Sequence, residues 1–497
     1  MPKQKIRVRI APSPTGNLHI GTARAALYNY LFAKKNRGDF ILRIEDTDIE
    51  RSDSQYTKDI INGLKWLGID WDEGPGKIGW YGPYFQSKRT KIYEKYIKQL
   101  LAQGKAYHCY CTEEELDKER IEQEEKKLPP KYSGRCRDLT HEQIQKFKIE
   151  GRKSIIRFKI PNEIVKFKDL VRKEVEFDSN LIGDIAIAKD LKTPLYNFAV
   201  VVDDETMKIS HVIRGEDHIS NTPKQILIAK ALGFKIPTYA HLPLILGHDK
   251  SKLSKRHGAT SVIEYREQGY LPEAMVNFMA LLGWNPGDDR EIFTFKELIK
   301  EFSLKKVHKG GAIFNMKKLD WINSQHIKNK SLKELTKLCI PFFIENNLIQ
   351  KIGRNKFEIK NTKEKIDFNY LEKIVALEQE RIKKLSEIGE CTNYFFFERL
   401  KYEPKILIWK KSDQETTIFN LKKLYTTLSA LDENDFTEKN LEKVLLKICG
   451  EDRGATLWPL RVALCGRKNS PGPFAIATIL GKEKTLARIE MAEKMLG

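Results

Sequence analysis

Residues 6–45, IRVRIAPSPTGNLHIGTARAALYNYLFAKKNRGDFILRIE, decide the fold class of this chain. Apolar residues and arginines alternate over residues 6–10, which predicts a β-strand. After a turn, apolar residues recur at helical spacing up to Gly38, a good helix stop, and residues 39–45 predict a second strand. A strand, a helix and a strand within so short a segment form a βαβ unit. The segment therefore predicts an α/β fold with a parallel sheet, whose ligands bind at the carboxyl ends of the strands.

The turn before the helix holds two glycines, Gly16 and Gly21, with His19 between them. A dinucleotide-binding turn carries three glycines as G-x-G-x-x-G, and the middle one is missing here. A P-loop has glycines at this spacing but continues with Lys and then Ser or Thr, where this chain has Thr22 and Ala23. The turn therefore fits neither of these two phosphate-binding motifs.

A third phosphate-binding motif fits the turn. The turn resembles that of class I aminoacyl-tRNA synthetases, in which a histidine-bearing turn opens a helix and a distant lysine loop completes a clamp on the ATP triphosphate. This chain carries such a loop, KLSKR, at residues 252–256. Together, the two motifs in this order are far more specific than either motif alone.

Longer segments resemble one branch of that class, the bacterial glutamyl-tRNA synthetase family. They are RIAPSPTGNLHIGTARAALYNY (9–30), ILRIEDTD (41–48), VIRGEDHISNTPKQ (212–225), KLSKRHGATSV (252–262) and, near the C-terminus, GPFAIATILGKEKTLARI (472–489). The resemblance covers essentially the whole chain and is strongest up to about residue 325. It implies a Rossmann-like parallel-sheet catalytic domain, an inserted domain, a stem-contact domain and an all-helical anticodon-binding region.

The expected domain boundaries follow from the resemblance and from changes in the sequence pattern. The catalytic domain is expected in two halves, 1–85 and 191–240, around a β-rich, tRNA acceptor-binding insertion at 86–190, followed by the stem-contact domain at 241–325 and the anticodon-binding region at 326–497. Residues 196–217, YNFAVVVDDETMKISHVIRGED, are predicted to resume the sheet pattern.

The reaction of this family joins an amino-acid carboxylate to the α-phosphate of ATP. The nucleophile is already ionised, so the site must supply alignment and positive charge rather than a general base. We expect catalytic roles for His19, Lys252 and Lys255. The resemblance implies ATP contacts from His19, Gly21, Asp217, Ile245 and Lys255, with ATP bound as its Mg²⁺ complex.

The amino-acid pocket needs cations for the carboxylates of glutamate and an anion for its ammonium group. Arg9 and Arg214 can supply forked donors, and Glu45 can accept the ammonium group. The resemblance implies glutamate contacts from Arg9, Ala11, Ser13, Glu45, Tyr196 and Arg214. An arginine that holds a carboxylate pairs poorly with the amide of glutamine, so we expect discrimination without an editing domain.

Three of the seven cysteines cluster in the predicted insertion. Cys109 and Cys111 are followed after 24 residues by Cys136. In zinc-binding members of the family this pattern continues to a histidine, and Asp138 stands at that position in this chain. A structural zinc ion is expected on the three thiolates, with Asp138 as the fourth ligand. His108 and His141 also lie near, and the alternative is that metal binding has been lost.

Composition favours a polyanionic partner. The chain carries 88 Lys and Arg against 68 Asp and Glu, a formal net charge of +20. The expected partners are tRNA(Glu), L-glutamate and ATP, and Arg381 is expected to contact the anticodon. The sequence has no long apolar run and no apolar leader, which predicts a cytoplasmic protein with no membrane span, and the resemblance implies a monomer.

Four alternatives are weighed at this stage. A glutaminyl enzyme would use β-barrels for the anticodon, against the helical pattern of the C-terminal third, and a short tRNA-modifying paralogue would lack that third. A glutamyl enzyme that also charges tRNA(Gln) stays open. A basic RNA-binding protein without catalysis would not need both phosphate motifs.

Overall fold

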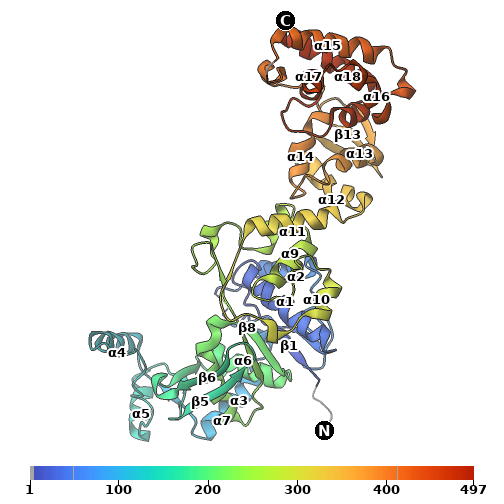
Figure 1. Ribbon diagram of the computed structural model, residues 1–497. Coiled ribbons are helices and arrows are strands. Elements are labelled where there is room, and N and C mark those ends of the chain that lie inside the picture. Colours follow the sequence, from blue (N-terminus) through green and yellow to red (C-terminus); the bar gives the residue numbers. More distant parts are fainter. Residues whose placement is uncertain (1–4, 49, 411) are drawn as a thin grey trace. The chain divides into compact units, whose positions relative to one another are not determined.

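The computed structural model describes residues 5–48, 50–410 and 412–497. The chain forms two compact units, each described by itself below (Figure 1). Unit 1 comprises residues 1–266 and 272–319, and unit 2 comprises residues 267–271 and 320–497.

The predicted βαβ segment is present at the centre of unit 1. Strand β1 (Arg7–Ile10) pairs in parallel with β2 (Asp39–Leu42), and α1 (Ile20–Lys35) connects them. Strand β8 (His211–Gly215) runs beside β1, because Ser210 N–H donates to the carbonyl of Arg7 at 2.9 Å. β8 also pairs in parallel with β9 (Thr238–Leu242). The prediction of an α/β fold with parallel strands is confirmed.

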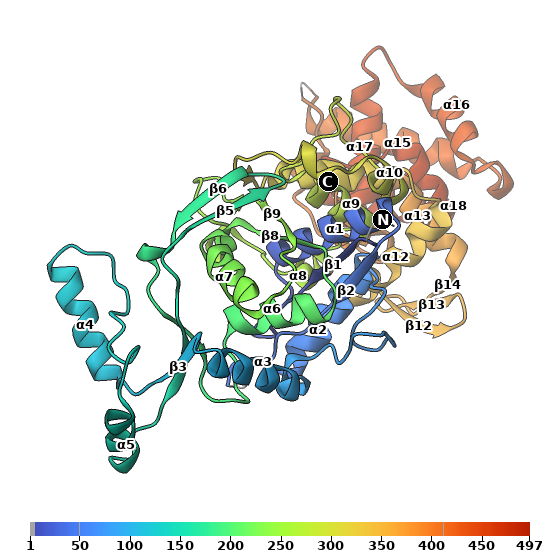
Figure 2. The ribbon, with the colours of Figure 1, turned by 90° about the horizontal axis from the view of Figure 1, so that it is seen from below.

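The predicted insertion contributes to two sheets. Its own antiparallel sheet has the order β3 (Ala106–Cys109), β4 (Ile155–Phe158), β7 (Ile185–Ala188), and two helices, α4 (Glu113–Glu125) and α5 (His141–Ile149), lie between β3 and β4 in the chain. The hairpin of β5 (Ile164–Asp169) and β6 (Lys173–Asp178) instead extends the sheet that contains β8 and β9, in the order β6-β5-β9-β8 (Figure 2).

The prediction that residues 196–217 resume the sheet was wrong for their first half, which forms helix α6 (Tyr196–Thr206). The run Phe198–Val202 is buried throughout, and a short buried apolar run does not distinguish a strand from a helix by its periodicity. The remaining helices of this part are α2 (Ser54–Trp66), α3 (Thr90–Ala102) and α7 (Thr222–Leu232); α3 packs against α6 and α7.

The segment after β9, up to α11, contains few strand residues. A two-residue parallel pair joins β10 (Ile245–Leu246) to β11 (Ala312–Ile313), and the helices are α8 (Val262–Glu267), α9 (Pro272–Leu281), α10 (Phe295–Glu301) and α11 (Met316–Lys328). α9 and α10 pack against α1. The boundary between the units falls inside α11, close to the predicted boundary at 325/326.

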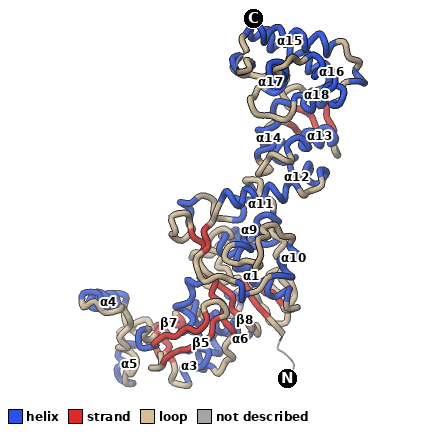
Figure 3. The backbone as a smooth tube through the Cα atoms, viewed as in Figure 1, coloured by secondary structure: helices blue, strands red, loops and turns tan. Residues whose placement is uncertain are grey.

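Unit 2 is mostly helical, but the prediction of an all-helical region was wrong. An antiparallel sheet of β12 (Ile349–Gly353), β13 (Lys356–Ile359) and β14 (Lys365–Asp367) follows α12 (Leu332–Glu345) (Figure 3). These strands are short and lysine-rich, so only Ile349, Phe357, Ile359 and Ile366 are buried and the apolar signal is weak. The other helices are α13 (Phe368–Glu378), α14 (Glu387–Thr392), α15 (Gln414–Ser429), α16 (Glu438–Ile448), α17 (Arg453–Cys465) and α18 (Pro473–Leu496). Within the described residues, no helix is long and apolar enough to cross a membrane.

Candidate active site

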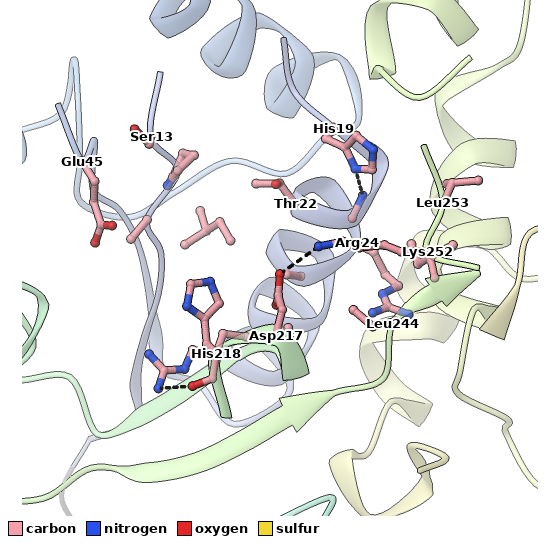
Figure 4. A pocket seen from close by; sticks show the side chains of 18 of the residues that line it. Ser13, His19, Thr22, Arg24, Glu45, Asp217, His218, Leu244, Lys252 and Leu253 are labelled. Atoms are coloured by element: carbon pink, nitrogen blue, oxygen red, sulfur yellow. Dashed lines mark hydrogen bonds and ion pairs between the residues drawn. The ribbon is translucent and has the colours of Figure 1, made fainter. Parts of the chain in front are cut away.

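A cavity of about 440 Å³ opens at the carboxyl ends of β1 and β8 (Figure 4). Every residue predicted above to bind ATP or glutamate lines it, with the exception of Lys255: Arg9, Ala11, Ser13, His19, Gly21, Glu45, Tyr196, Arg214, Asp217, Ile245 and Lys252. In the view of Figure 4, Glu45 and Ser13 lie on one side of the cavity and His19 and Lys252 on the other. The fold therefore brings together residues that lie far apart in the sequence, at the edge where a parallel sheet binds its ligands.

His19 is the N-cap of α1, and its ring has a defined donor. Nδ1 accepts a hydrogen bond from Gly21 N–H at 3.0 Å, so the proton of the neutral ring is on Nε2. Burial, and after it the charge of Lys252, lowers the pKa of His19, which keeps the ring neutral near pH 7. Nε2–H and the free N–H groups of the first helical turn can thus both donate to an anion.

The segment that follows the KLSKR loop is hydrogen-bonded to the same turn. Ile20 N–H donates to the carbonyl of Thr260, and Val262 N–H donates to the carbonyl of Leu18, both at 2.9 Å. Lys252 Nζ lies 3.3 Å from Asp217 Oδ2, and its side chain is 63 % exposed. A single weak, solvent-exposed ion pair of this kind leaves Lys252 available to a phosphate.

Lys255 lies in the short 3₁₀ helix Lys255–His257, and its side chain lies outside what the structure describes. His257 organises this loop from inside. Its Nδ1 accepts from Ser254 N–H at 3.0 Å, and its Nε2 lies 3.1 Å from Asp249 Oδ1. A Cβ at Gly247 would come within 2.5 Å of this ring, so the loop needs glycine there.

The opposite wall of the cavity is a buried network of charges. Arg9 donates from Nε and Nη2 to Asp204 at 3.1 and 3.3 Å, and Arg43 donates from Nη1 to Asp204 at 2.8 Å and from Nη2 to Glu45 Oε1 at 3.1 Å. Burial raises the pKa of Glu45, and the charges of Arg43 and Arg9 oppose that rise. For Asp204 the two arginines outweigh burial and lower the pKa. Glu45 and Asp204 are thus held by the same two cations.

Arg214, near the end of β8, is buried and lines the cavity, and one nitrogen of its guanidinium has no hydrogen-bond partner among the described residues. Its Nε donates to His241 Nε2 at 3.3 Å, and its Nη2 donates to Thr222 Oγ1 at 2.8 Å. Among the described residues, none hydrogen-bonds to its buried Nη1. A buried donor without a partner costs about 1–3 kcal/mol, and a carboxylate bound in the cavity would remove that cost.

Tyr196 and His218 lie side by side in the cavity wall, with Tyr196 Oη 3.1 Å from His218 Nδ1. Burial raises the pKa of Tyr196, so its hydroxyl stays protonated. Burial and the charge of Arg214 lower the pKa of His218 to about 4. Two neutral hydrogen-bonding groups therefore line the same cavity as Arg214 and Glu45.

The three cysteines of the insertion form one cluster. The Sγ atoms of Cys109, Cys111 and Cys136 all lie within 4.8 Å of one another, and all three thiols are free. Tyr132 Oη lies 3.4 Å from Cys109 Sγ and 3.6 Å from Cys111 Sγ, and accepts from Cys136 N–H at 2.9 Å. The structure thus places a tyrosine hydroxyl beside the thiols.

The structure does not place Asp138 in this cluster. Its carboxylate is not among the groups within reach of the thiols; it is 84 % exposed and lies 3.4 Å from Lys159 Nζ. His108 and His141 are not in the cluster either; His108 Nδ1 lies 3.1 Å from Ser154 Oγ, and His141 Nε2 lies 3.2 Å from Gln145 Nε2.

Arg381 lies in unit 2, just after α13, and its side chain is 43 % exposed. Its Nε donates to Glu378 Oε2 at 2.9 Å and its Nη1 to the carbonyl of Ser470 at 3.2 Å. These contacts hold the guanidinium at the surface of unit 2.

Sequence reasoning missed four residues that build these sites, namely Arg43, Asp204, His218 and Tyr132. Arg43 and Asp204 had a usable signal, because each is a charged residue beside a buried apolar run. His218 lies inside a quoted segment, but nothing in its spacing indicated that it faces the cavity. Tyr132 had no signal, since a tyrosine four residues before a cysteine is ordinary.

Comparisons with known proteins agree with this site. Residues 5–321 match the family model of the class I tRNA synthetases for glutamate and glutamine, catalytic domain, and residues 334–493 match an anticodon-binding domain. The cavity with its histidine turn and lysine loop is therefore the site of a class I tRNA synthetase.

Individual relatives show which branch of the class I tRNA synthetases the chain belongs to. The chain is 49 % identical to glutamate–tRNA ligase 1 of Caldicellulosiruptor saccharolyticus, over 98 % of both chains, and 48 % identical to glutamate–tRNA ligase of Carboxydothermus hydrogenoformans, over 97 % of this chain and 99 % of the relative. A crystal structure of glutamate tRNA ligase from Elizabethkingia meningosepticum in complex with its amino acid matches with a TM-score of 0.87 at 35 % identity, over 99 % of this chain and 100 % of that one. The chain belongs to the glutamate–tRNA ligase family.

Proposed function

We propose that this protein is an active glutamate–tRNA ligase. It activates L-glutamate with ATP and transfers the glutamyl group to the 3′-terminal adenosine of tRNA(Glu). The observation that carries the proposal is the cavity itself, in which a neutral histidine at a helix N-terminus faces the same space as a buried arginine with an unused donor.

In the activation step, a carboxylate oxygen of glutamate attacks the α-phosphorus of ATP, and the bond to the bridging oxygen of the β-phosphate breaks. Pyrophosphate carries away the electron pair, and no proton needs to be removed from the nucleophile. His19 Nε2–H, the N-terminus of α1 and the lysines of the KLSKR loop hold the phosphates as charge moves onto pyrophosphate. ATP enters as its Mg²⁺ complex.

Glutamate binds with its side-chain carboxylate on Arg214 and its ammonium group on Glu45. Arg43 occupies Oε1 of Glu45, which leaves Oε2 for the substrate. Ser13 and Tyr196 donate hydroxyl hydrogen bonds. Glutamine would place an amide against the buried guanidinium and leave a charge poorly paired, and mismatches of this kind discriminate by about 10⁴–10⁵-fold.

In the transfer step, the 2′-hydroxyl of the terminal adenosine attacks the carbonyl carbon of glutamyl-adenylate and AMP leaves. Residues 86–190 hold the acceptor end, residues 241–325 contact the stem, and residues 326–497, with Arg381, bind the anticodon. The net charge of +20 supports binding to the phosphates of tRNA. The protein acts in the cytoplasm as a monomer.

Pyrophosphate exchange tests the activation step. The purified protein, with tRNA(Glu) present, is expected to exchange pyrophosphate into ATP only when L-glutamate is added. A basic RNA-binding protein without catalysis would bind tRNA and give no exchange, so absence of exchange in a folded preparation would overturn the proposal.

Replacing Lys255 with alanine is expected to lower the exchange rate by about 100-fold, because the transition state loses one cation on its phosphates. The thermal unfolding midpoint is expected to stay unchanged. Lys208→Ala is the control, since Lys208 pairs at the surface with Glu205 at 2.7 Å and is 51 % exposed. Normal pyrophosphate exchange in Lys255→Ala would show that Lys255 does not hold the phosphates of ATP.

The cysteine cluster is proposed to hold a structural zinc ion, with Tyr132 as the fourth ligand. Tetrahedral zinc with Zn–S bonds of ~2.3 Å separates two sulfurs by about 3.8 Å. Cys111 Sγ and Cys136 Sγ lie 3.6 Å apart, and the tyrosine oxygen lies at comparable distances from two of the thiols. The geometry therefore fits a closed site with no position for a substrate.

Zinc analysis tests this site. The purified protein is expected to contain about one zinc ion per chain, and Cys136→Ser is expected to lose it and to unfold at a lower temperature. Tyr132→Phe is expected to weaken zinc retention during dialysis against a chelator. Asp138→Ala is the matched control and is expected to retain zinc as the unaltered protein does; a loss of zinc there would restore Asp138 as the ligand.

A further inference from the structure

We infer that Asp169 and His241 are positioning residues, which fix the orientation of Arg214 for the side-chain carboxylate of glutamate. The inference rests on the proposed function, since it assigns Arg214 to that carboxylate. Neither Asp169 nor His241 lines the cavity, and both act through Arg214.

The three side chains form a continuous chain of hydrogen bonds inside unit 1. His241 Nδ1 lies 2.7 Å from Asp169 Oδ2, and Arg214 Nε donates to His241 Nε2 at 3.3 Å. The side chains of Asp169 and His241 are completely buried, and Arg214 is 6 % exposed. Water therefore cannot substitute for a partner that is lost.

The direction of each hydrogen bond follows from the chemistry of the groups. Asp169 is a carboxylate and accepts only, so His241 must carry its proton on Nδ1. Nε2 then has a free lone pair, which lies 3.0 Å from Thr222 Oγ1 and 3.3 Å from Arg214 Nε. Since Arg214 is a donor only, Nε2 is the acceptor at that contact. A protonated His241 would instead point an N–H at the guanidinium. Burial lowers the pKa of His241, which opposes that form.

Asp169 is itself held rigidly. Its Oδ1 accepts from the N–H groups of Val171 and Arg172, both at 2.8 Å, at the turn that ends β5. Asp169 is also the residue at which β5 pairs with Tyr239 of β9. A buried carboxylate therefore lies where the β5–β6 hairpin meets β9, and its Oδ2 is directed at His241.

This arrangement leaves Arg214 one orientation. Nε is held by His241 and Nη2 by Thr222, so Nη1 is the one guanidinium nitrogen of this cavity-lining residue that has no partner among the described residues. Without the acceptor on His241 the guanidinium can rotate about its side-chain bonds. Glutamate binding must then offset the conformational entropy that is lost when the guanidinium is ordered. The expected consequence is a weaker affinity for glutamate rather than for ATP.

Two substitutions at His241 separate this role from a packing role. A glutamine amide reaches the Nε2 position and retains an acceptor for Arg214, whereas an asparagine amide reaches only the Nδ1 position and retains the contact with Asp169. We expect His241→Asn to raise the KM for glutamate by about 10-fold or more, and His241→Gln to raise it by less than about 3-fold. The KM for ATP is expected to stay unchanged in both.

Asp169→Asn tests the other end of the chain. Its Oδ1 can still accept from Val171 and Arg172, but its amide N–H₂ would replace the acceptor facing His241 Nδ1 and move the ring proton to Nε2. We expect at least the loss seen for His241→Asn, with an unchanged KM for ATP. Tyr239→Phe is the control, because it keeps the ring that stacks on His241 at 6.0 Å and removes only the hydroxyl.

The unaltered protein is assayed first for charging of tRNA(Glu) with glutamate, and failure there would reject the proposed function rather than this inference. Given an active protein, two results overturn the inference: equal losses in His241→Asn and His241→Gln, or an unchanged KM for glutamate in Asp169→Asn. Thermal unfolding accompanies each assay, and if Asp169→Asn is unfolded, the comparison of the two His241 variants decides.

Discussion

Replacing Arg214 with alanine is expected to lower kcat/KM for glutamate by about 10³-fold, which corresponds to about 4 kcal/mol of transition-state stabilisation. The substitution removes a guanidinium that lines the cavity and whose buried Nη1 has no hydrogen-bond partner among the described residues. It also leaves the substrate carboxylate buried without a cation, and desolvated charges are costly when unpaired. Steady-state charging of tRNA(Glu) at varied glutamate concentrations measures the effect.

A surface arginine of the same unit provides the control for Arg214. Arg290 pairs with Asp288 and Glu301 at 2.8 and 2.7 Å and is 49 % exposed, so Arg290→Ala is expected to leave kcat/KM unchanged. The KM for ATP is expected to be unchanged in Arg214→Ala. A loss of ATP affinity equal to the loss of glutamate affinity would show that Arg214 maintains the whole cavity and does not hold the carboxylate.

Replacing Asp203 with alanine is expected to destabilise unit 1 by about 3–5 kcal/mol, which lowers its thermal transition by about 10 °C. Asp203 accepts from Arg89 Nε at 2.7 Å, from Tyr93 Oη at 2.9 Å and from Gln86 Nε2 at 2.8 Å. Removing it leaves these donors unpaired in a dry interior, since Arg89 and Tyr93 are 1 % and 0 % exposed. Differential scanning calorimetry measures the shift.

Glu205, on the same helix α6, provides the control for Asp203. Glu205 pairs with the exposed Lys208 at 2.7 Å, and Glu205→Ala is expected to shift the transition by no more than about 0.5 kcal/mol. Similar shifts in both variants would mean that the helix, and not the buried charge network, sets the stability of this region.

Local pattern and resemblance predicted much of this molecule. The strand–helix–strand segment around Gly38 and the parallel sheet were predictable because alternation and helical spacing are strong signals over a few residues. The family resemblance rests on contiguous motifs, and it allowed the candidate site residues to be named. All of these residues apart from Lys255 line one cavity.

The remainder was not predictable because it depends on tertiary packing. The buried run before Asp203 forms a helix since α3 and α7 cover it, and periodicity alone does not reveal that cover. Nothing in the sequence around His241 pointed to a partner, and only the placement of β5 beside β9 brings Asp169 to it. Tyr132 reaches the thiols, and Asp138 does not, through the path of a loop without regular structure.

Charging purified tRNA(Glu) and tRNA(Gln) in parallel, each with glutamate and with glutamine, tests the central claim that the cavity selects a side-chain carboxylate. We expect glutamate to be attached to tRNA(Glu) and glutamine to be attached to neither tRNA. Glutamate on tRNA(Gln) would show a second RNA substrate and leave the assignment of the cavity intact. Attachment of glutamine, or a folded protein that does not attach glutamate to tRNA(Glu), would contradict the account.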